Sequence, residues 1–303
     1  MPITPSLPIR FGDSDGDMGA HIQAAADTIT LTSLDLIPTL VGDALTLFGH
    51  ADGGNDDLDN TGFSTIPLVI GDAITIEDGA RGGNDHISAL GRGSAICLGD
   101  AITLSGNAEG GNDTIRVDAD NGMAIAYGDA QSMTDHAKGG DDTLSGSSFR
   151  TQTILYGDAE TLSGSAAGGN DTLTASGPTS SGDPTLMYGD GAELLDHAKG
   201  GDDTLISGTG NDQMWGDAAT ISAHAKTGAD TFSFAGSNGR DTINDFETGK
   251  DHIQLNGYGF ANFNDLASHI EYTQDGALIT FDANDSILVV GVNHLSASDF
   301  ILA

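Results

Sequence analysis

Residues 99–115 read GDAITLSGNAEGGNDTI, and residues 128–144 read GDAQSMTDHAKGGDDTL. Both stretches keep one frame: a Gly-Asp pair, an apolar residue five positions after the glycine, an aspartate at fourteen and an apolar residue at sixteen. Clear copies of the pair begin at Gly42, Gly71, Gly99, Gly128, Gly157, Gly189 and Gly216, and by subtraction they lie 29, 28, 29, 29, 32 and 27 residues apart. A degenerate copy begins at Gly12. Such a period indicates a repeat architecture, in which each repeat packs on its neighbours.

Two aspartates recur in every clear copy of the frame. The aspartates of the Gly-Asp pairs form what we call the first aspartate column: Asp43, Asp72, Asp100, Asp129, Asp158, Asp190 and Asp217. The aspartates fourteen residues after each glycine form the second aspartate column: Asp56, Asp85, Asp113, Asp142, Asp171, Asp203 and Asp230. All length variation falls after position sixteen, so each repeat combines a constant block with a tolerant connector.

The segments around each Gly-Asp pair have the composition of short β-strands. Apolar and β-branched runs precede the pair, as at 67–70, 153–156 and 185–188. A second strand fits 101–104, a third fits 112–115, and glycine-rich turns between such short runs disfavour helices. Coils stacked about 4.8 Å apart would align the apolar positions in continuous columns. We therefore predict an all-β fold, a parallel β-roll or β-solenoid over residues 12–235, with about seven to eight coils of about 29 residues.

The charge balance of the chain points to a cation. The sequence holds 45 Asp and Glu against 10 Lys and Arg, which gives a formal net charge of −35. Such a chain repels itself when it is compact, and it also repels the phosphates of nucleic acids. Calcium is bound by six to eight oxygen atoms from carboxylates and carbonyls, so turns rich in glycine and aspartate suit it. We expect several calcium ions to neutralise these carboxylates.

Residues 200–216, GGDDTLISGTGNDQMWG, resemble two successive nonapeptides of the RTX, or haemolysin-type calcium-binding, family. The resemblance implies a parallel β-roll with calcium in its turns. It implies ligands in the second aspartate column first, in the first aspartate column second, and at Asp212. The other repeats depart from the family pattern, because they carry about ten extra residues and a reduced second half-turn.

Three alternatives concern other features of the repeats. Aspartate and asparagine also favour turns without any metal, so the aspartates can be plain architecture. Histidines share the position eight residues after the glycine and would suit zinc if they stacked, although glycine, asparagine and serine occupy the same position elsewhere. These histidines are His50, His136, His197 and His224. A threonine column would suit ice binding, although strand propensity also explains it. It contains Thr46, Thr75, Thr103, Thr161 and Thr220.

Residues 236–303 follow a different pattern and are expected to form a small β-rich unit that caps the last coil. A short helix fits 262–270, and strands fit 271–273, 277–281 and 286–290. This region resembles the C-terminal region of RTX proteins such as the serralysin proteases, through DTINDF at 241–246 and LSASDFIL at 295–302. The resemblance implies an uncleaved type I secretion signal and a type I exporter as partner. The protease motif His-Glu-x-x-His does not occur in the sequence.

Residues 1–11 are expected to be an N-terminal extension, without the basic start and apolar run of a Sec signal peptide. No run of about 18 apolar residues predicts a membrane span. The single cysteine, Cys97, excludes an intramolecular disulfide and sits in an apolar run that predicts burial. Together these features predict a secreted, extracellular calcium-binding structural or interaction protein, not an enzyme, with an extracellular partner that the sequence does not name. The alternatives are a secreted enzyme that acts on polysaccharide from one solenoid face, and an ice-binding solenoid.

Overall fold

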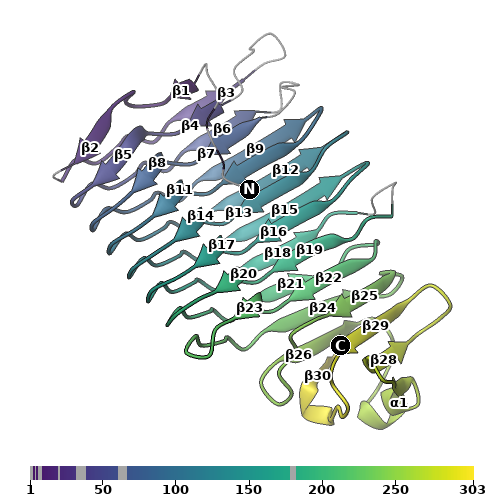
Figure 1. Ribbon diagram of the computed structural model, residues 1–303. Coiled ribbons are helices and arrows are strands. Elements are labelled where there is room, and N and C mark those ends of the chain that lie inside the picture. Colours follow the sequence, from purple (N-terminus) through teal and green to yellow (C-terminus); the bar gives the residue numbers. More distant parts are fainter. Residues whose placement is uncertain are drawn as a thin grey trace.

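The chain winds into a parallel β-solenoid of about seven turns of about 29 residues, with a small antiparallel unit at its C-terminal end (Figure 1). The structure is a computed structural model, and it describes residues 3, 5, 9–19, 21–31, 39–60, 67–177 and 182–303. Each repeat contributes one strand to each of three sheets, and successive repeats pair in parallel. The predicted fold class is therefore confirmed.

Sheet 1 contains the strand that precedes each Gly-Asp pair. Its order is β1 (Ile9–Phe11), β4 (Thr39–Val41), β7 (Leu68–Ile70), β10 (Ala95–Leu98), β13 (Ala124–Tyr127), β16 (Thr153–Tyr156), β19 (Thr185–Tyr188), β22 (Asp212–Trp215), β25 (Arg240–Ile243), β29 (Ser286–Val290), β28 (Gly276–Thr280) and β27 (Ile270–Tyr272). The runs predicted at 153–156 and 185–188 are β16 and β19, and the run at 67–70 contains β7.

Sheet 2 contains the strand that follows each pair. Its order is β2 (Asp17–Gly19), β5 (Ala44–Phe48), β8 (Ala73–Ile76), β11 (Ala101–Leu104), β14 (Ala130–Met133), β17 (Ala159–Leu162), β20 (Gly191–Leu194) and β23 (Ala218–Ile221). The prediction of a strand at 101–104 is confirmed by β11. The degenerate first copy also forms a coil, since β1, β2 and β3 begin the three sheets.

Sheet 3 contains the strand that follows each aspartate of the second column. Its order is β3 (Thr28–Thr30), β6 (Asp57–Asn60), β9 (His86–Gly91), β12 (Thr114–Ala119), β15 (Thr143–Ser148), β18 (Thr172–Ala175), β21 (Thr204–Ile206), β24 (Thr231–Ala235), β26 (His252–Asn256) and β30 (Phe300–Leu302). The third strand was predicted at 112–115, but β12 begins two residues later and extends to Ala119. The aspartate in front of each strand remains in the turn.

Two separate apolar clusters fill the inside of the coils. One lies between sheets 1 and 3 and includes Leu58, Cys97 and Leu144. The other lies under sheet 2 and is built from its inward-facing residues and the alanine of the following turn, such as Leu104 and Ala108. Cys97 is fully buried, as its apolar run predicted. Burial of such columns stabilises the fold by roughly 25 cal/mol per Å² of apolar surface.

A third apolar cluster contains the residue that precedes each Gly-Asp pair. In its C-terminal half this column becomes a stack of rings, and the centroids of Tyr127, Tyr156, Tyr188 and Trp215 lie 4.9, 5.0 and 4.6 Å apart in succession. The N-terminal segment reaches this part of the molecule, because the backbone N–H of Ile3 donates to Oε1 of Gln131 at 2.9 Å. Of the predicted extension 1–11, residues 1, 2, 4 and 6–8 lie outside the described residues.

The C-terminal unit continues two of the three sheets. Strands β26 and β30 extend sheet 3 in parallel. Strands β25 and β29 extend sheet 1 in parallel, and β28 and β27 then continue it as antiparallel neighbours. The helix predicted at 262–270 is the shorter α1 (Phe263–Ala267), which Asn262 caps by accepting from the N–H of Asn264, and a 3₁₀ turn, η1 (Ala297–Asp299), precedes β30. None of the helices that the structure describes has the length and hydropathy needed to cross a bilayer.

Candidate metal sites in the aspartate columns

Both aspartate columns lie inside the coils, in a region that we call the waist. The waist consists of the Gly-Asp pair and the Gly-Gly-x-Asp segment of each coil, which meet across the interior between the two apolar clusters. In each of the seven clear coils the second glycine of the Gly-Gly segment (alone, Gly228, in the last) donates its N–H to the first-column carboxylate, at 2.5–2.9 Å. This bond joins two segments eleven residues apart and holds the two sides of the coil close together.

The second aspartate column forms a continuous hydrogen-bonded ladder. The N–H of each aspartate donates to Oδ1 of the aspartate in the next coil, as from Asp113 to Asp142 at 2.7 Å. The ladder starts at Asp27, which donates to Asp56, and ends at Asp251, which accepts from Asp230. Each carboxylate therefore gains one charge-assisted bond from the preceding coil.

Every coil also contains a buried carboxylate oxygen without a hydrogen-bond partner among the described residues. In the second column this atom is Oδ2 of all seven aspartates. In the first column it is Oδ1 of Asp43 and Oδ2 of Asp100, Asp129, Asp158 and Asp190. All fourteen aspartates are at most 3% exposed. An ionised carboxylate buried without partners is costly, so these atoms need either protons or cations.

Burial shifts the ionisation of both columns in the same direction. It raises the pKa of Asp56 to about 7 and of Asp230 to about 9, with further increases from neighbouring aspartates. Burial raises the pKa of Asp113 well above its ordinary value, and Asp100 and Asp142 add to the shift. Burial raises the pKa of Asp43 to about 6 in the first column. The fold without a cation thus favours carboxyl groups that hold their protons.

Glycine is required in the waist because of close approach. A Cβ on Gly99 would overlap with the carbonyl oxygen of Gly128 and with Oδ2 of Asp113. The same relation recurs at Gly42, Gly71, Gly128, Gly157 and Gly189. A backbone carbonyl oxygen and an unpaired carboxylate oxygen therefore lie side by side in successive coils. Carboxylate and carbonyl oxygens are the donors that calcium prefers, so the donor chemistry fits this ion.

Asp212 lies elsewhere, at the corner between sheets 3 and 1. Its Oδ2 accepts from the N–H of Gly208 at 2.9 Å and from the hydroxyl of Ser207 at 3.0 Å, and the hydroxyl and N–H of Thr185 also bond to this carboxylate. The N–H of Asp212 donates to Oδ1 of Asp241 at 2.9 Å, and burial together with Asp212 raises the pKa of Asp241 to about 8. Sequence reasoning gave Asp241 no ligand role, although it follows Asp212 by 29 residues, one repeat length. The structure therefore does not group Asp212 with either main column.

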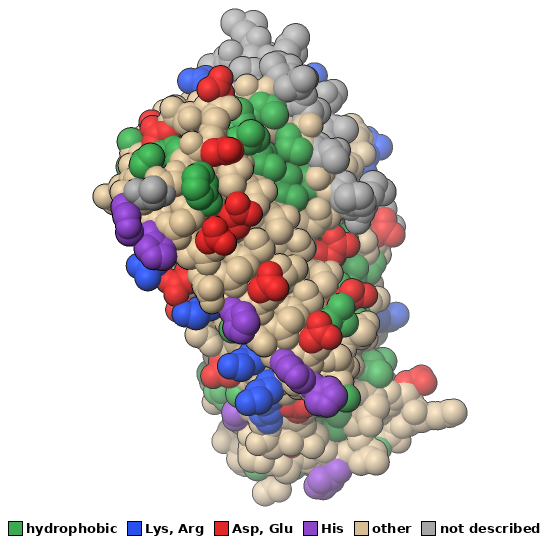
Figure 2. All heavy atoms as spheres, turned by 60° about the vertical axis from the view of Figure 1, so that its left-hand side comes forward, with side chains coloured by type: hydrophobic (Ala, Val, Ile, Leu, Met, Phe, Trp, Pro, Cys, Tyr) green, Lys and Arg blue, Asp and Glu red, His purple; other side chains and the backbone are tan. Residues whose placement is uncertain are grey.

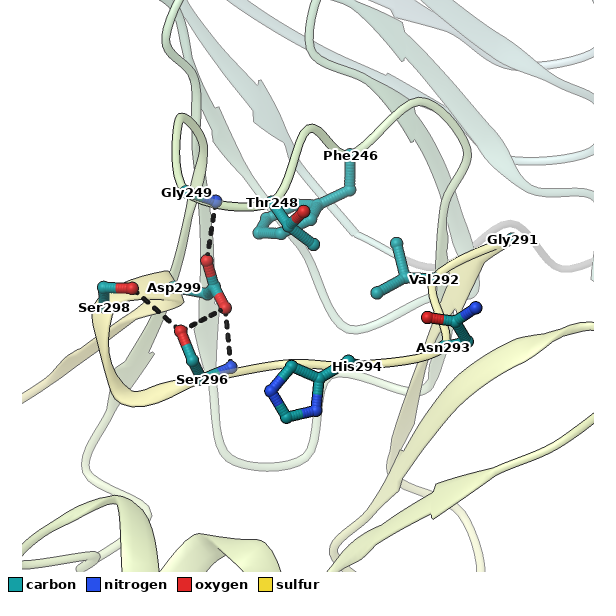
Figure 3. Close-up of a pocket in the computed structure, with 10 residues that line it drawn as sticks. All are labelled: Phe246, Thr248, Gly249, Gly291, Val292, Asn293, His294, Ser296, Ser298 and Asp299. Carbon is teal, nitrogen blue, oxygen red and sulfur yellow. Dashed lines mark hydrogen bonds between the residues drawn. The ribbon is translucent and has the colours of Figure 1, made fainter.

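Buried aspartates in the C-terminal unit are fully paired. Oδ1 of Asp251 accepts from Asp230 at 3.0 Å, and its Oδ2 accepts from the N–H of Glu247 at 2.8 Å. Asp299 lies in the wall of a cavity of about 530 Å³, where it accepts from the N–H of Gly249 and from the N–H and hydroxyl of Ser296 (Figure 3). The remaining wall, which includes Thr248 and His294, holds no converging set of charged groups.

Histidine and basic side chains gather along one outer edge of the solenoid (Figure 2). Ring centroids of His197 and His224 lie 5.2 Å apart, and the same distance separates His21 from His50. The part of the chain that the structure describes contains no group of three or more His, Cys, Asp or Glu side chains placed to hold a metal ion. A calcium site in the waist would therefore depend on backbone carbonyls as well as carboxylates.

The threonine column, which would suit ice binding, lies on sheet 2. Its register continues from β5 to β23, but Ser132 and Glu193 interrupt it.

Comparison with known proteins yields no assignment, since no protein-family model and no curated protein matches the chain.

Proposed function

We propose that this protein is a secreted, calcium-dependent structural or interaction protein whose solenoid folds when calcium enters the waist. The observation that carries the proposal is the unpaired carboxylate oxygen in the second aspartate column, which recurs in each of the seven clear coils. In six of these coils the carbonyl oxygen of the Gly-Asp glycine in the next coil lies beside it, as Gly128 does at Asp113. Oxygens from two successive coils would then share each ion.

Calcium binding would remove the two costs that the fold carries by itself. The first is the desolvation of carboxylates that are nearly inaccessible to water. The second is the repulsion along each column, which contributes to the raised pKa of Asp72, Asp113 and Asp129. Binding to the folded chain alone stabilises that state by mass action, so calcium affinity and folding become one equilibrium.

This coupling suits export of an unfolded chain and folding outside the cell. At low free calcium the net charge of −35 keeps the chain loose, and millimolar calcium outside the cell would favour the compact form. The ending at 295–302 supports a type I exporter by its resemblance alone. The proposal includes no catalytic role, and the extracellular partner stays unassigned.

Far-UV circular dichroism in chelator, followed by a calcium titration, tests the proposal. We expect a cooperative gain of β signal with a midpoint between micromolar and millimolar calcium. A magnesium titration at equal ionic strength is the control, because magnesium demands a tighter octahedral site and gives up its water reluctantly. Equal β structure with and without calcium would sink the proposal and would leave the aspartates as plain architecture.

A further inference from the structure

Sheet 2 ends at β23, whereas sheets 1 and 3 continue into the C-terminal unit (Figure 1). In earlier coils the carbonyl oxygen of the apolar residue at position five accepts an N–H from the next coil, as Leu194 does from Ser222 at 2.8 Å. Ile221 is the equivalent residue of β23, and among the described residues no further coil supplies this bond. Such an unpaired edge is a template for another strand.

The apolar cluster under sheet 2 is also uncovered at this edge. The residues at position five are fully buried in the six preceding clear coils, as Leu104 and Leu194 are, but Ile221 is 38% exposed. In β23 only Ala218 is buried. By contrast, Phe232 of β24 is fully buried, since β26 lies beyond it in sheet 3. A further strand would bury Ile221 as β23 buries Leu194.

The turn after each strand of sheet 2 shows how successive coils pair their charges. Position ten after the glycine holds Arg81, Glu109 and Lys138 in three successive coils. The carboxylate of Glu109 lies between the other two side chains, 3.0 Å from Nε of Arg81 and 2.8 Å from Nζ of Lys138. A carboxylate in one coil therefore neutralises a basic side chain in the next.

The same column ends in two lysines at the open edge. Lys199 and Lys226 lie in register on the last two coils, both are exposed, and neither forms an ion pair in the described part of the chain. Residues 218–229 contain no aspartate or glutamate, although the chain has 45. The exposed Glu193 and Asp196 belong to the preceding coil, one rung further from the edge. The rung beyond Lys226 therefore favours a carboxylate, as in the earlier ion pairs.

The step beside β23 suits a single strand rather than a second solenoid. Beyond the last coil, β25 already pairs with β22 and β26 already pairs with β24. A second solenoid would need the edges of all three sheets to continue the coil, and two of them are taken. An extended segment needs only the edge of β23.

We infer that the open edge of sheet 2 binds an extended acidic peptide segment of a partner protein, which adds a strand beside β23. An apolar side chain of the peptide covers Ile221, and a carboxylate five residues later pairs with Lys226. Leu104 and Glu109 have this spacing in the interior of the solenoid. The inference goes beyond the proposed function, on which it rests only because the solenoid must be folded.

A fluorescein-labelled synthetic peptide of residues 101–109, AITLSGNAE, tests the edge, because this segment has a known register in sheet 2 and its turn. Fluorescence anisotropy is measured with the full chain in millimolar calcium, and we expect saturable binding with a Kd below about 1 mM. Lys226→Glu should weaken binding at least about tenfold, because two carboxylates then face each other. The substitution Glu109→Lys in the peptide should restore binding to that variant.

Lys138→Glu is the matched control, since it reverses the same charge in the same column, but in a coil whose strand β14 is paired on both sides. It should leave the Kd unchanged, and circular dichroism should report folded β structure in millimolar calcium for both variants. Absence of saturable binding, or an equal Kd for the unsubstituted chain and Lys226→Glu, would overturn the inference.

Sedimentation of the unsubstituted chain covers the other occupant. Concentration-dependent dimers that Lys226→Glu abolishes would name a second copy of the chain as the partner of this edge, and would also overturn the inference. None of these outcomes would alter the calcium titration, so the two proposals fail separately.

Discussion

Asp142 in the repeats and Asp251 in the C-terminal unit stand in the same ladder but are satisfied differently. Oδ1 of each accepts an N–H from the preceding coil. Oδ2 of Asp251 also accepts from the N–H of Glu247, whereas Oδ2 of Asp142 has no partner among the described residues. The backbone can therefore supply the second hydrogen bond of a buried carboxylate where the chain bends toward it.

In the seven clear coils no N–H of a described residue donates to Oδ2 of the second-column aspartate. Their glycines instead place a carbonyl oxygen beside the unpaired carboxylate oxygen, as Gly128 does at Asp113. A bend in the chain like that at residues 247–251 would place an N–H donor beside the unpaired carboxylate oxygen. A carbonyl oxygen, which is an acceptor, lies there instead. Two acceptors side by side favour a cation, so under the calcium proposal the repeat carboxylates need a ligand that the paired carboxylates of the C-terminal unit do not need.

Removal of calcium should have the largest effect on this comparison. We expect amides of the coils between Gly42 and Asp230 to lose protection from hydrogen exchange in chelator, because their buried carboxylates then lack neutralisation. Exchange followed by mass spectrometry, with and without calcium, measures the loss for each coil. Protection that is unchanged in the coils would contradict the distinction between the two regions.

Stability in chelator should fall as the pH rises. Burial raises the pKa of Asp43 to about 6, of Asp56 to about 7 and of Asp230 to about 9, above the value in the unfolded chain. Their contribution is therefore complete below about pH 4 and is lost as the pH rises through these values toward 9. Thermal unfolding at pH 4 to 9 measures the trend. Calcium should remove it, and a stability that rises with pH in chelator would refute the assignment.

Gly99→Ala should destabilise the protein by about 3 kcal/mol or more in calcium, because the new Cβ overlaps with two oxygens of the waist. Gly236→Ala is the matched control, since a Cβ there meets nothing within 4 Å. Its effect should stay within about 1 kcal/mol. Urea unfolding of both variants decides the point, and equal effects would show that the waist tolerates a side chain.

Asparagine substitutions should have the smallest effects, with opposite signs in chelator. Asp142→Asn replaces a buried carboxyl group that must take up a proton in the calcium-free fold, because burial raises its pKa, so we expect it to stabilise the calcium-free chain and to weaken calcium binding about tenfold. Asp299→Asn replaces an acceptor that is paired on both oxygens, so it should cost about 1–3 kcal/mol with or without calcium. The free energy of unfolding of both variants, measured with calcium and in chelator, tests this. Stability changes of the same sign in chelator would contradict the distinction between the two regions.

The repeat period by itself determined the fold class and most of the strands. Spacing of 27 to 32 residues between Gly-Asp pairs predicted one coil per repeat, and the apolar positions at five and sixteen predicted which side chains face inward, except for Ile221 in the last coil, which is exposed. Strands β11, β16 and β19 match their predicted bounds because each is short and bounded by glycine or polar turns. The periodic aspartates could be identified as candidate sites for the same reason.

Only the tertiary structure decided where those aspartates lie and what surrounds them. Periodicity places residues in columns, but it does not say that two columns meet across the interior or that the coil holds two apolar clusters. It also missed Asp251, whose ladder position comes from a turn of irregular length. Contacts between segments that do not share the period are set by packing in three dimensions, and no local pattern encodes them.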